Sequence, residues 1–292
     1  MEFYDLGTII KELRILKNIS QSELCRGICS QSQISKIEKG TIYPSSILLI
    51  QIAEKLGIDP NYIFALTKNK KLKYIENVKY VMRDCVKQKK YKELYEIVKI
   101  EKNKTNFLQK DDKQFLLWHE ALAIFYVNGS TKNAVDILNK ALKLTSINSK
   151  FLSEKEINIV HSIAVIHAEN KEYEKSINIL KKILNNFNKI DFPKNKEIQL
   201  KIIYNLTKCL HNICEHEEAI KYSDMGIKLA ININSLYLLG ELYFEKGSNL
   251  LKLEHPQKDG LNDIKKALFI FELTERKQYI KIIKDKYFKK QN

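Results

Sequence analysis

Between Gln31 and Lys39 the chain carries a run of polar side chains that can hydrogen bond the edges of DNA bases. Glutamine can bond adenine at two points, serine can bond either base of a pair, and lysine can reach guanine or a phosphate. Ile34 and Ile37 are three residues apart, so on a helix they share the inner face and turn the polar residues outward. We therefore predict that this helix enters the major groove of double-stranded DNA. Its candidate DNA-binding residues are Gln31, Ser32, Gln33, Ser35, Lys36 and Lys39.

Capping residues around the segment from Gln31 to Lys39 indicate where two consecutive helices begin and where the second one ends. Ser20 followed by Glu23 forms a capping box, Ser30 caps the next helix, and Gly40 ends it. Exposed N–H groups at such helix starts can hold phosphates, and Gln21, which begins the earlier helix, is a further candidate DNA contact. A small helical bundle whose polar residues serve only for solubility explains the same pattern, so this alternative stays open.

Residues 1–66 are predicted to form one small domain of five short helices. An apolar stripe with helical spacing begins at Leu6 and marks the first helix. The segment "YPSS" (43–46) opens the fourth helix, Gly57 ends it, and Pro60 stands in the first turn of the fifth. We expect a helix at about residues 60–75 to join this domain to the rest of the chain.

The net charge of +15 is distributed unevenly along the 292 residues. Residues 1–66 hold seven basic and seven acidic side chains, so bulk charge does not mark this segment as a DNA binder. Residues 68–110 hold fourteen basic and five acidic side chains, a net +9. Something negative can bind there, although lysine-rich solvated helix faces are common.

A long repeat occupies residues 72–292. The octets "YKELYEIV", "TKNAVDIL", "YEKSINIL", "HEEAIKYS" and "QKDGLNDI" recur, and four of their five fourth residues are small. Each octet follows a helix rich in aromatic residues, which is typical of helix hairpins that stack into a solenoid. We predict five tetratricopeptide-like hairpins, closed by the amphipathic segment "RKQYIKIIKDKYFKK" as a capping helix. The fourth residues are Leu94, Ala134, Ser176, Ala219 and Gly260.

Composition restricts the class of protein. Glycine and proline are scarce, which favours helix nearly throughout. No apolar run is long enough to cross a bilayer, and the N-terminus lacks the basic region of a signal peptide, so we expect a cytoplasmic protein without membrane contact. The sequence holds no glycine-rich phosphate loop, His-Glu-x-x-His or nucleophile elbow. We therefore expect no enzyme, no catalytic residues and no cofactor.

Five cysteines with no Cys-x-x-Cys pair fit a reducing compartment. Cys209 and Cys214 lie beside His211 and His216, but the spacing matches no standard zinc pattern, and we expect no metal site. The cysteines are expected to be small buried hydrophobes. A redox-sensing thiol is the alternative.

Residues 6–57 resemble the Cro/repressor-type (XRE) helix-turn-helix family. In that family the base readers would fall on Gln31, Ser32 and Lys36, and a buried ion pair would fall on Arg14 and Glu38. The turn before the third helix departs from the pattern: it is one residue short, and Cys29 stands where the family usually has glycine. The matching positions are Leu13-Arg14, Ser20-Gln21, Glu23-Leu24, Ile34-Ser35, Ile37-Glu38, Gly40, Pro44, Ile52-Ala53 and Leu56.

Nearly the whole chain resembles the PlcR-type quorum-sensing regulators, through segments such as "CRGICSQSQISKIEKGTIYPS", "HAENKEYEKSI" and "INSLYLLGELYFEKG". The resemblance implies an all-α fold, with an N-terminal helix-turn-helix domain followed by a right-handed superhelical tetratricopeptide-like repeat domain. It also implies a homodimer that regulates transcription, most often as an activator, and binds a short signalling peptide in the groove of the repeats.

The same resemblance implies which residues contact the peptide. An extended peptide exposes backbone groups that inner-helix amides can clamp, and its carboxylates suit lysines. Glu241 stands where an amide is expected, which changes the peptide that is accepted. Helix packing, or solvation in the case of the lysines, is the alternative explanation for these residues. The candidate peptide-binding residues are Phe64, Lys87, Lys89, His161, Asn205, Glu241 and Tyr279.

Two other functions remain open on the sequence. One is a protein–protein scaffold in which the repeats bind a protein and the N-terminal bundle merely folds. The other is a DNA-binding repressor that ignores peptides. If two chains pair through the repeats and the joining helix, the operator should be an inverted repeat.

Overall fold

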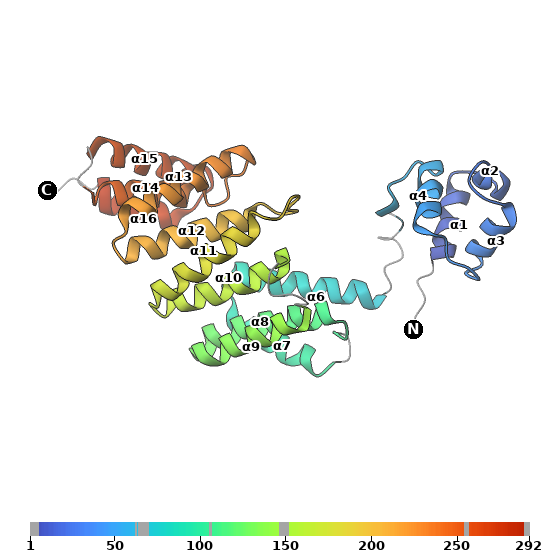
Figure 1. The fold of residues 1–292 in the computed structure, drawn as a ribbon, viewed down its shortest axis with the longest axis horizontal. Coiled ribbons are helices and arrows are strands. Elements are labelled where there is room, and N and C mark those ends of the chain that lie inside the picture. Colours follow the sequence, from blue (N-terminus) through green and yellow to red (C-terminus); the bar gives the residue numbers. More distant parts are fainter. Residues whose placement is uncertain are drawn as a thin grey trace. The chain divides into compact units, whose positions relative to one another are not determined.

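The structure is a computed structural model that describes residues 6–61, 63, 70–104, 107–145, 152–253 and 257–288. Within those ranges every regular element is a helix (Figure 1). The chain forms two compact units, Met1–Asp84 and Cys85–Asn292, and their boundary falls within the long helix α6. None of the described helices combines the length and the apolar character needed to span a bilayer.

The first unit is built on four labelled helices around one apolar core. Ile10, Leu24, Ile34 and Ile52 are fully buried in it, so each helix contributes an inward-facing residue. The expected fifth helix is described only in part: Pro60, Asn61 and Ile63 are helical. The helices are α1 (Leu6–Leu16), α2 (Gln21–Cys25), α3 (Gln31–Glu38) and α4 (Ser46–Lys55).

Local capping determines where these helices begin and end. Ser20 and Glu23 form the predicted capping box at α2, and the Ser30 hydroxyl accepts from the N–H of Gln33 at the start of α3. Gly40 follows α3 with a φ of 71°, a left-handed conformation that lets the chain turn away from the helix. These predicted caps of α2 and α3 are confirmed.

Helices α1 and α3 approach so closely that only glycine fits at their contact. A Cβ atom at Gly7 would lie 2.0 Å from the carbonyl oxygen of Ile37, well inside van der Waals contact. Because Ile37 belongs to α3, Gly7 sets how closely the helix with the candidate DNA-binding residues lies on α1. The position of α3 therefore depends on the absence of one side chain.

The second unit is a series of helices in which, from α7 onward, each packs against its neighbour in the chain (Figure 1). The predicted octets coincide with helix starts, because α7, α9, α11, α13 and α15 begin at their first residues. Helix α6 (Lys70–Lys87) contains the boundary between the units. The helices after it are α7 (Tyr91–Lys102), α8 (Lys110–Asn128), α9 (Thr131–Thr145), α10 (Glu154–Glu169), α11 (Tyr173–Phe187), α12 (Glu197–Asn212), α13 (His216–Asn232), α14 (Leu239–Leu250), α15 (Gln257–Leu273), α16 (Lys277–Ile283) and the π-helix η1 (Lys284–Phe288).

The small fourth residues of the octets lie in the contacts between these helices. Ala134, Ser176 and Ala219 are fully buried. Where the last two repeat helices cross, a Cβ atom at Gly247 of α14 would lie 2.7 Å from the carbonyl oxygen of Gly260 of α15. Small residues thus permit the close helix packing that the repeat pattern predicted.

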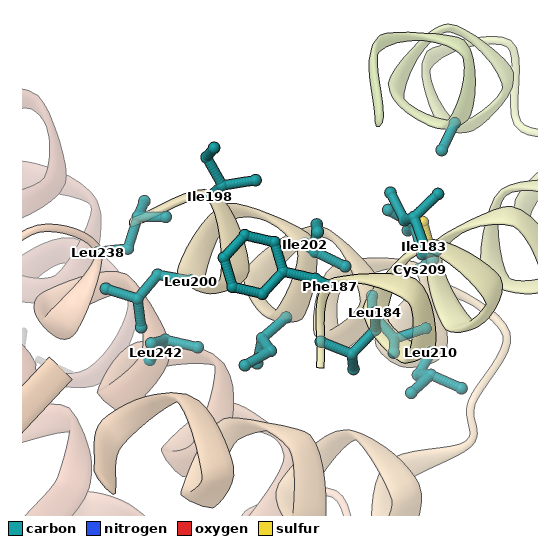
Figure 2. Close-up of a cluster of buried hydrophobic side chains, with 14 of the residues drawn as sticks. Ile183, Leu184, Phe187, Ile198, Leu200, Ile202, Cys209, Leu210, Leu238 and Leu242 are labelled. Atoms are coloured by element: carbon teal, nitrogen blue, oxygen red, sulfur yellow. The ribbon is translucent and has the colours of Figure 1, made fainter. Parts of the chain in front are cut away.

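Larger apolar side chains fill the space between successive hairpins. Figure 2 shows the main cluster, in which Phe187 of α11, Leu200 and Ile202 of α12 and Leu242 of α14 meet. Leu200, Ile202 and Leu242 are fully buried. This core joins α10 to α14 into one body and holds their polar faces in a constant arrangement.

Replacing Gly7 by alanine should destabilise the first unit. The added methyl group overlaps the Ile37 carbonyl, so α1 and α3 must separate, at a cost of about 1–3 kcal/mol in unfolding free energy. The gain in helix propensity offsets only about 1 kcal/mol. Urea titration of the full-length chain, read by hydrogen exchange at α1 and α3 amides, measures the effect. The matched control, Glu12→Ala at an exposed position of α1, should change stability by less than about 0.5 kcal/mol. If the α1 and α3 amides of Gly7→Ala are as strongly protected from hydrogen exchange as in the wild type, the close contact would be contradicted.

Candidate functional sites

Helix α3 presents the predicted DNA-binding side chains on its outer face. Gln31, Ser32, Gln33, Lys36 and Lys39 are exposed, and Ser35 is half-buried. Ile34 and Ile37, with exposures of 0% and 1%, anchor the opposite face in the core. The structure therefore gathers the predicted residues on one accessible surface, with donors and acceptors that suit base edges and phosphates.

A buried carboxylate ties α3 to two other helices. Nε and Nη2 of Arg14 on α1 donate to the two oxygens of Glu38 at 2.6 and 2.9 Å. Nε2 of Gln21 on α2 donates to Oε2 of Glu38 at 2.8 Å. Arg14 also donates through Nη1 to the carbonyl oxygen of Ile19 at 2.8 Å. One carboxylate thus fixes the orientation of α1, α2 and α3 toward one another.

The ionisation of Glu38 follows from these contacts. Burial opposes the charged form, but the hydrogen bonds from Arg14 and Gln21 outweigh it and hold the pKa of Glu38 below its usual range. The ion pair that the family resemblance placed on Arg14 and Glu38 is present in the structure. Removal of either partner would leave a charge that is buried without compensation.

Two features of the helix-turn-helix were not predicted from the sequence. The amide nitrogen of Gln21, a candidate DNA contact, donates to Glu38, and the residue is half-buried. The turn between α2 and α3 contains Gly27 with a φ of 77°, so the left-handed residue lies two positions before Cys29. Because Gly27 supplies the turn, Cys29 needs no left-handed backbone and is half-buried against the core.

In the second unit, four of the candidate peptide-binding residues lie on the helices from α10 to α16. Nδ2 of Asn205 on α12 donates to Nε2 of His161 on α10 at 2.9 Å and to the carbonyl oxygen of Lys201 at 3.0 Å. The ring of His161 also has a hydrogen bond to the backbone of Lys201. Burial, reinforced by the charge of Lys201, lowers the pKa of His161 to about 4, so the ring is neutral at pH 7.

Contacts continue from this pair toward the C-terminus. The ammonium of Lys201 lies 5.8 Å from the ring centre of Tyr237. Glu241 of α14 forms an ion pair with Arg276, whose guanidinium lies 5.8 Å from the ring centre of Tyr279. Burial, with the nearby charges of Glu197 and Glu241, raises the pKa of Tyr237 to about 12. These groups form a polar strip composed of His161, Lys201, Asn205, Tyr237, Glu241, Arg276 and Tyr279.

The remaining candidate peptide residues are placed apart from the strip or lie outside the described residues. Lys87 ends α6 and Lys89 occupies the following turn with a φ of 58°, and both are exposed. Among the residues described, no contact links either lysine to the polar strip. Phe64 lies outside the described residues.

Sequence reasoning missed three members of the strip, although a helical-spacing signal was available for two. Lys201 stands four residues before Asn205, and Arg276 stands three residues before Tyr279, so each shares a helix face with a residue that was predicted. Tyr237 lies in the turn before α14, where no periodic pattern points to it.

Near α12, Cys209 and the two histidines contact other side chains, whereas Cys214 is exposed, contrary to the expectation that the cysteines are buried. His211 and His216 both direct Nδ1 at Oδ1 of the buried Asn249, at 2.9 and 2.7 Å. Burial raises the pKa of the Cys29 and Cys209 thiols, which disfavours the reactive thiolate. In the described part of the chain, no three His, Cys, Asp or Glu side chains are grouped to hold a metal ion.

Known structures share this architecture. PlcR of Bacillus thuringiensis in complex with the peptide PapR7 and DNA is 29% identical, with a TM-score of 0.81 over 96% of this chain and 99% of PlcR. Its apo form is 28% identical, with a TM-score of 0.68 over 98% and 100% of the two chains. The SHP pheromone receptor Rgg2 of Streptococcus dysgalactiae has the same fold at 17% identity, with a TM-score of 0.66 over 97% and 98%. No curated protein matches the sequence.

Family profiles cover both units. A helix-turn-helix profile matches residues 10–63, which include α2 and α3. The profile of the RNPP family C-terminal domain matches residues 79–290, more than half of the chain and all of the polar strip. The chain therefore belongs to the RNPP family, and PlcR is among the solved structures that it resembles.

Proposed function

We propose that the chain is a peptide-responsive, DNA-binding transcription regulator of the quorum-sensing type. It binds double-stranded DNA through α3 and a short signalling peptide through the polar strip, acts in the cytoplasm and has no catalytic activity of its own. The similarity to PlcR, whose structure holds both a peptide and DNA, supports this combination. The observation that carries the proposal is the exposed polar face of α3, held in place by the Arg14–Glu38–Gln21 contacts.

For the DNA-binding half, the exposed residues divide by chemistry. Gln31 and Ser32, in the first turn of α3, reach base edges and provide sequence selectivity. Lys36 and Lys39 lie farther along the helix, where an ammonium group neutralises phosphate or bonds guanine. Gln21 acts mainly through Glu38, as an orienting residue, because its amide nitrogen is engaged there.

One α3 helix spans too few base pairs for a specific site, which argues for two copies of the chain on one operator. A dimer with two-fold symmetry requires an inverted repeat, with half-sites about 34–36 Å apart or a multiple of that distance. Bound peptide would shift the population of dimers toward the spacing that fits the operator, and so activate transcription.

For the peptide-binding half, Asn205 provides an acceptor for the peptide backbone and His161 orients it. The neutral ring of His161 contacts the Asn205 amide and the backbone of Lys201, so it holds that amide in one orientation. In the described residues both N–H groups of the Asn205 amide are used and its oxygen Oδ1 is not, so that oxygen can accept a peptide N–H. An amide oxygen held in one orientation suits the N–H groups of an extended peptide backbone.

Variants on α3 should separate base reading from phosphate binding. With genomic fragments that the wild-type chain retains as probes, the double variant Gln31→Ala/Ser32→Ala should lose affinity for them by about 10-fold or more, but little affinity for random DNA. Lys39→Ala should weaken binding to the retained fragments and to random DNA alike. It should also reduce the slope of log K, the logarithm of the association constant, against log salt concentration by about 1. The control Lys228→Ala, an exposed lysine of α13, should change neither. Fluorescence anisotropy at several salt concentrations measures all three.

The DNA experiment also discriminates between functions. Retained fragments should share an inverted repeat when they are sequenced. If the wild-type chain retains no fragment at micromolar concentration, with or without peptide, a scaffold that binds only proteins would replace the proposal. Equal losses on specific and random DNA for Gln31→Ala/Ser32→Ala would move base recognition away from α3.

Asn205→Ala should weaken peptide binding about 10-fold, because it removes an amide that clamps the peptide backbone and orients His161. The probe is the set of short peptides that the full-length chain captures from a degenerate library, and calorimetry gives the affinities. Asn212→Ala is a matched control, because Asn212 lies on the same helix and makes the same kind of bond to the carbonyl oxygen four residues earlier. Equal effects of the two substitutions would exclude Asn205 from the site, and capture of no peptide would favour a peptide-independent repressor.

Linkage provides a further check on the proposed mechanism. If peptide binding tightens operator binding by some factor, operator DNA must tighten peptide binding by the same factor. For a coupling of about 1–3 kcal/mol this factor is about 5–150. Peptide titrations with and without a retained DNA fragment should show this change in peptide affinity, with random DNA as the control. Identical peptide affinities in the presence and absence of the operator would mean that the two sites are not coupled.

A further inference from the structure

Lys201 is a cation of the polar strip that forms no ion pair with any residue that the structure describes. Its side chain is half-buried, and its ammonium faces the ring of Tyr237 at 5.8 Å from the ring centre. Across the residues that the structure describes, it makes neither an ion pair nor a hydrogen bond to a side chain. Glu197, one turn earlier on α12, is the acid that acts on it, and this influence is weaker than the effect of burial.

The other charges of the strip are already compensated. Glu241, the acidic residue that departs from the family pattern, is paired with Arg276 and therefore offers no free carboxylate. Lys208, two turns beyond Lys201 on α12, acts on the buried Glu245. Among the described residues of the strip, Lys201 is thus a charged group without an ion pair, compensated only in part by Glu197, and it lies next to the neutral pair of His161 and Asn205.

We propose that Lys201 binds a carboxylate of the signalling peptide, so that this chain selects acidic peptides. The inference rests on the proposed peptide-binding function and adds the chemical class of the ligand. A half-buried ammonium that lacks a partner gains a charge-assisted bond when a carboxylate replaces water beside it. Burial lowers the pKa of Lys201, which a bound carboxylate would reverse.

The geometry also places the carboxylate relative to the peptide backbone. Asn205 lies one helical turn from Lys201 and donates to the carbonyl oxygen of Lys201. A peptide whose backbone is held by Asn205 therefore has its neighbouring group within reach of the ammonium. That group is either the peptide's terminal carboxylate or an Asp or Glu side chain, and both share the same chemistry.

The test uses the full-length chain and two degenerate libraries of short peptides, one with free C-terminal carboxylates and one with C-terminal amides. Peptides retained by the wild-type chain should be enriched in free carboxylates relative to the input. Enrichment limited to the free-acid library would assign the terminal carboxylate, and enrichment of Asp or Glu in both libraries would assign a side chain. Retained peptides are then resynthesised with the critical carboxylate and with the corresponding amide.

Substitution of Lys201 should remove the preference without removing the fold. Lys201→Met should weaken binding of the acidic peptide about 10-fold or more, and binding of its amide counterpart less than about 2-fold. Lys201→Arg should keep the preference, and Lys228→Met should match wild type. The midpoint of thermal unfolding should not fall in Lys201→Met, because a charge held in a half-buried site is removed.

The outcomes separate this inference from the function on which it rests. Retention of peptides without any dependence on carboxylates would overturn the role of Lys201 and leave peptide binding in place. The same holds if Lys201→Met keeps the acidic preference of the wild type. Retention of no peptide from either library would contradict the proposed function itself, and the inference with it.

Discussion

Close approach of helix backbones is the constraint on which both units depend. In the first unit α1 can lie against the end of α3 only because position 7 carries no side chain. In the second unit α14 and α15 cross where Gly247 faces Gly260, and Ala134, Ser176 and Ala219 are buried in the corresponding helices of earlier repeats. Backbone contact leaves little freedom in the angle between two helices. The surfaces that such helices carry are therefore held in constant positions, which a recognition helix and a peptide site both require.

Local signals in the sequence were sufficient for the helices themselves. Ser20 with Glu23 and Ser30 bond backbone groups only three residues away, so their capping role is visible without knowledge of the fold. The octets also mark helix starts, because each octet is a short continuous segment that can be recognised without knowledge of the fold. Helical spacing also predicted correctly that Ile34 and Ile37 are buried and that Lys36 and Lys39 are exposed.

Contacts between distant residues could not be obtained in this way. Gln21 is polar and stands at a helix start, so its bond to Glu38, seventeen positions later, depends on how α2 crosses α3. The pairing of Glu241 with Arg276 spans 35 positions and converts an expected free carboxylate into a neutral pair. Cys214 adopts a left-handed φ of 63° in the turn after α12, where a sequence pattern would favour glycine. In each case the packing of neighbouring helices outweighs the preference of the single residue.

The two Arg–Glu pairs show how similar chemistry serves two different surfaces. Arg14 is largely buried and binds both oxygens of Glu38, so that pair is directed inward and leaves the outer face of α3 to uncharged and basic side chains. Arg276 is more exposed and lies over Tyr279, so its pair with Glu241 forms part of the polar strip itself. Since burying an unpaired carboxylate is costly, each Glu requires its Arg. With these acids paired, the groups that we propose for ligand recognition are the amides and lysines of α3 and, in the strip, His161, Asn205 and Lys201. Both surfaces therefore agree with the proposed partners, which bring negative charge: a DNA backbone in one case and a peptide carboxylate in the other.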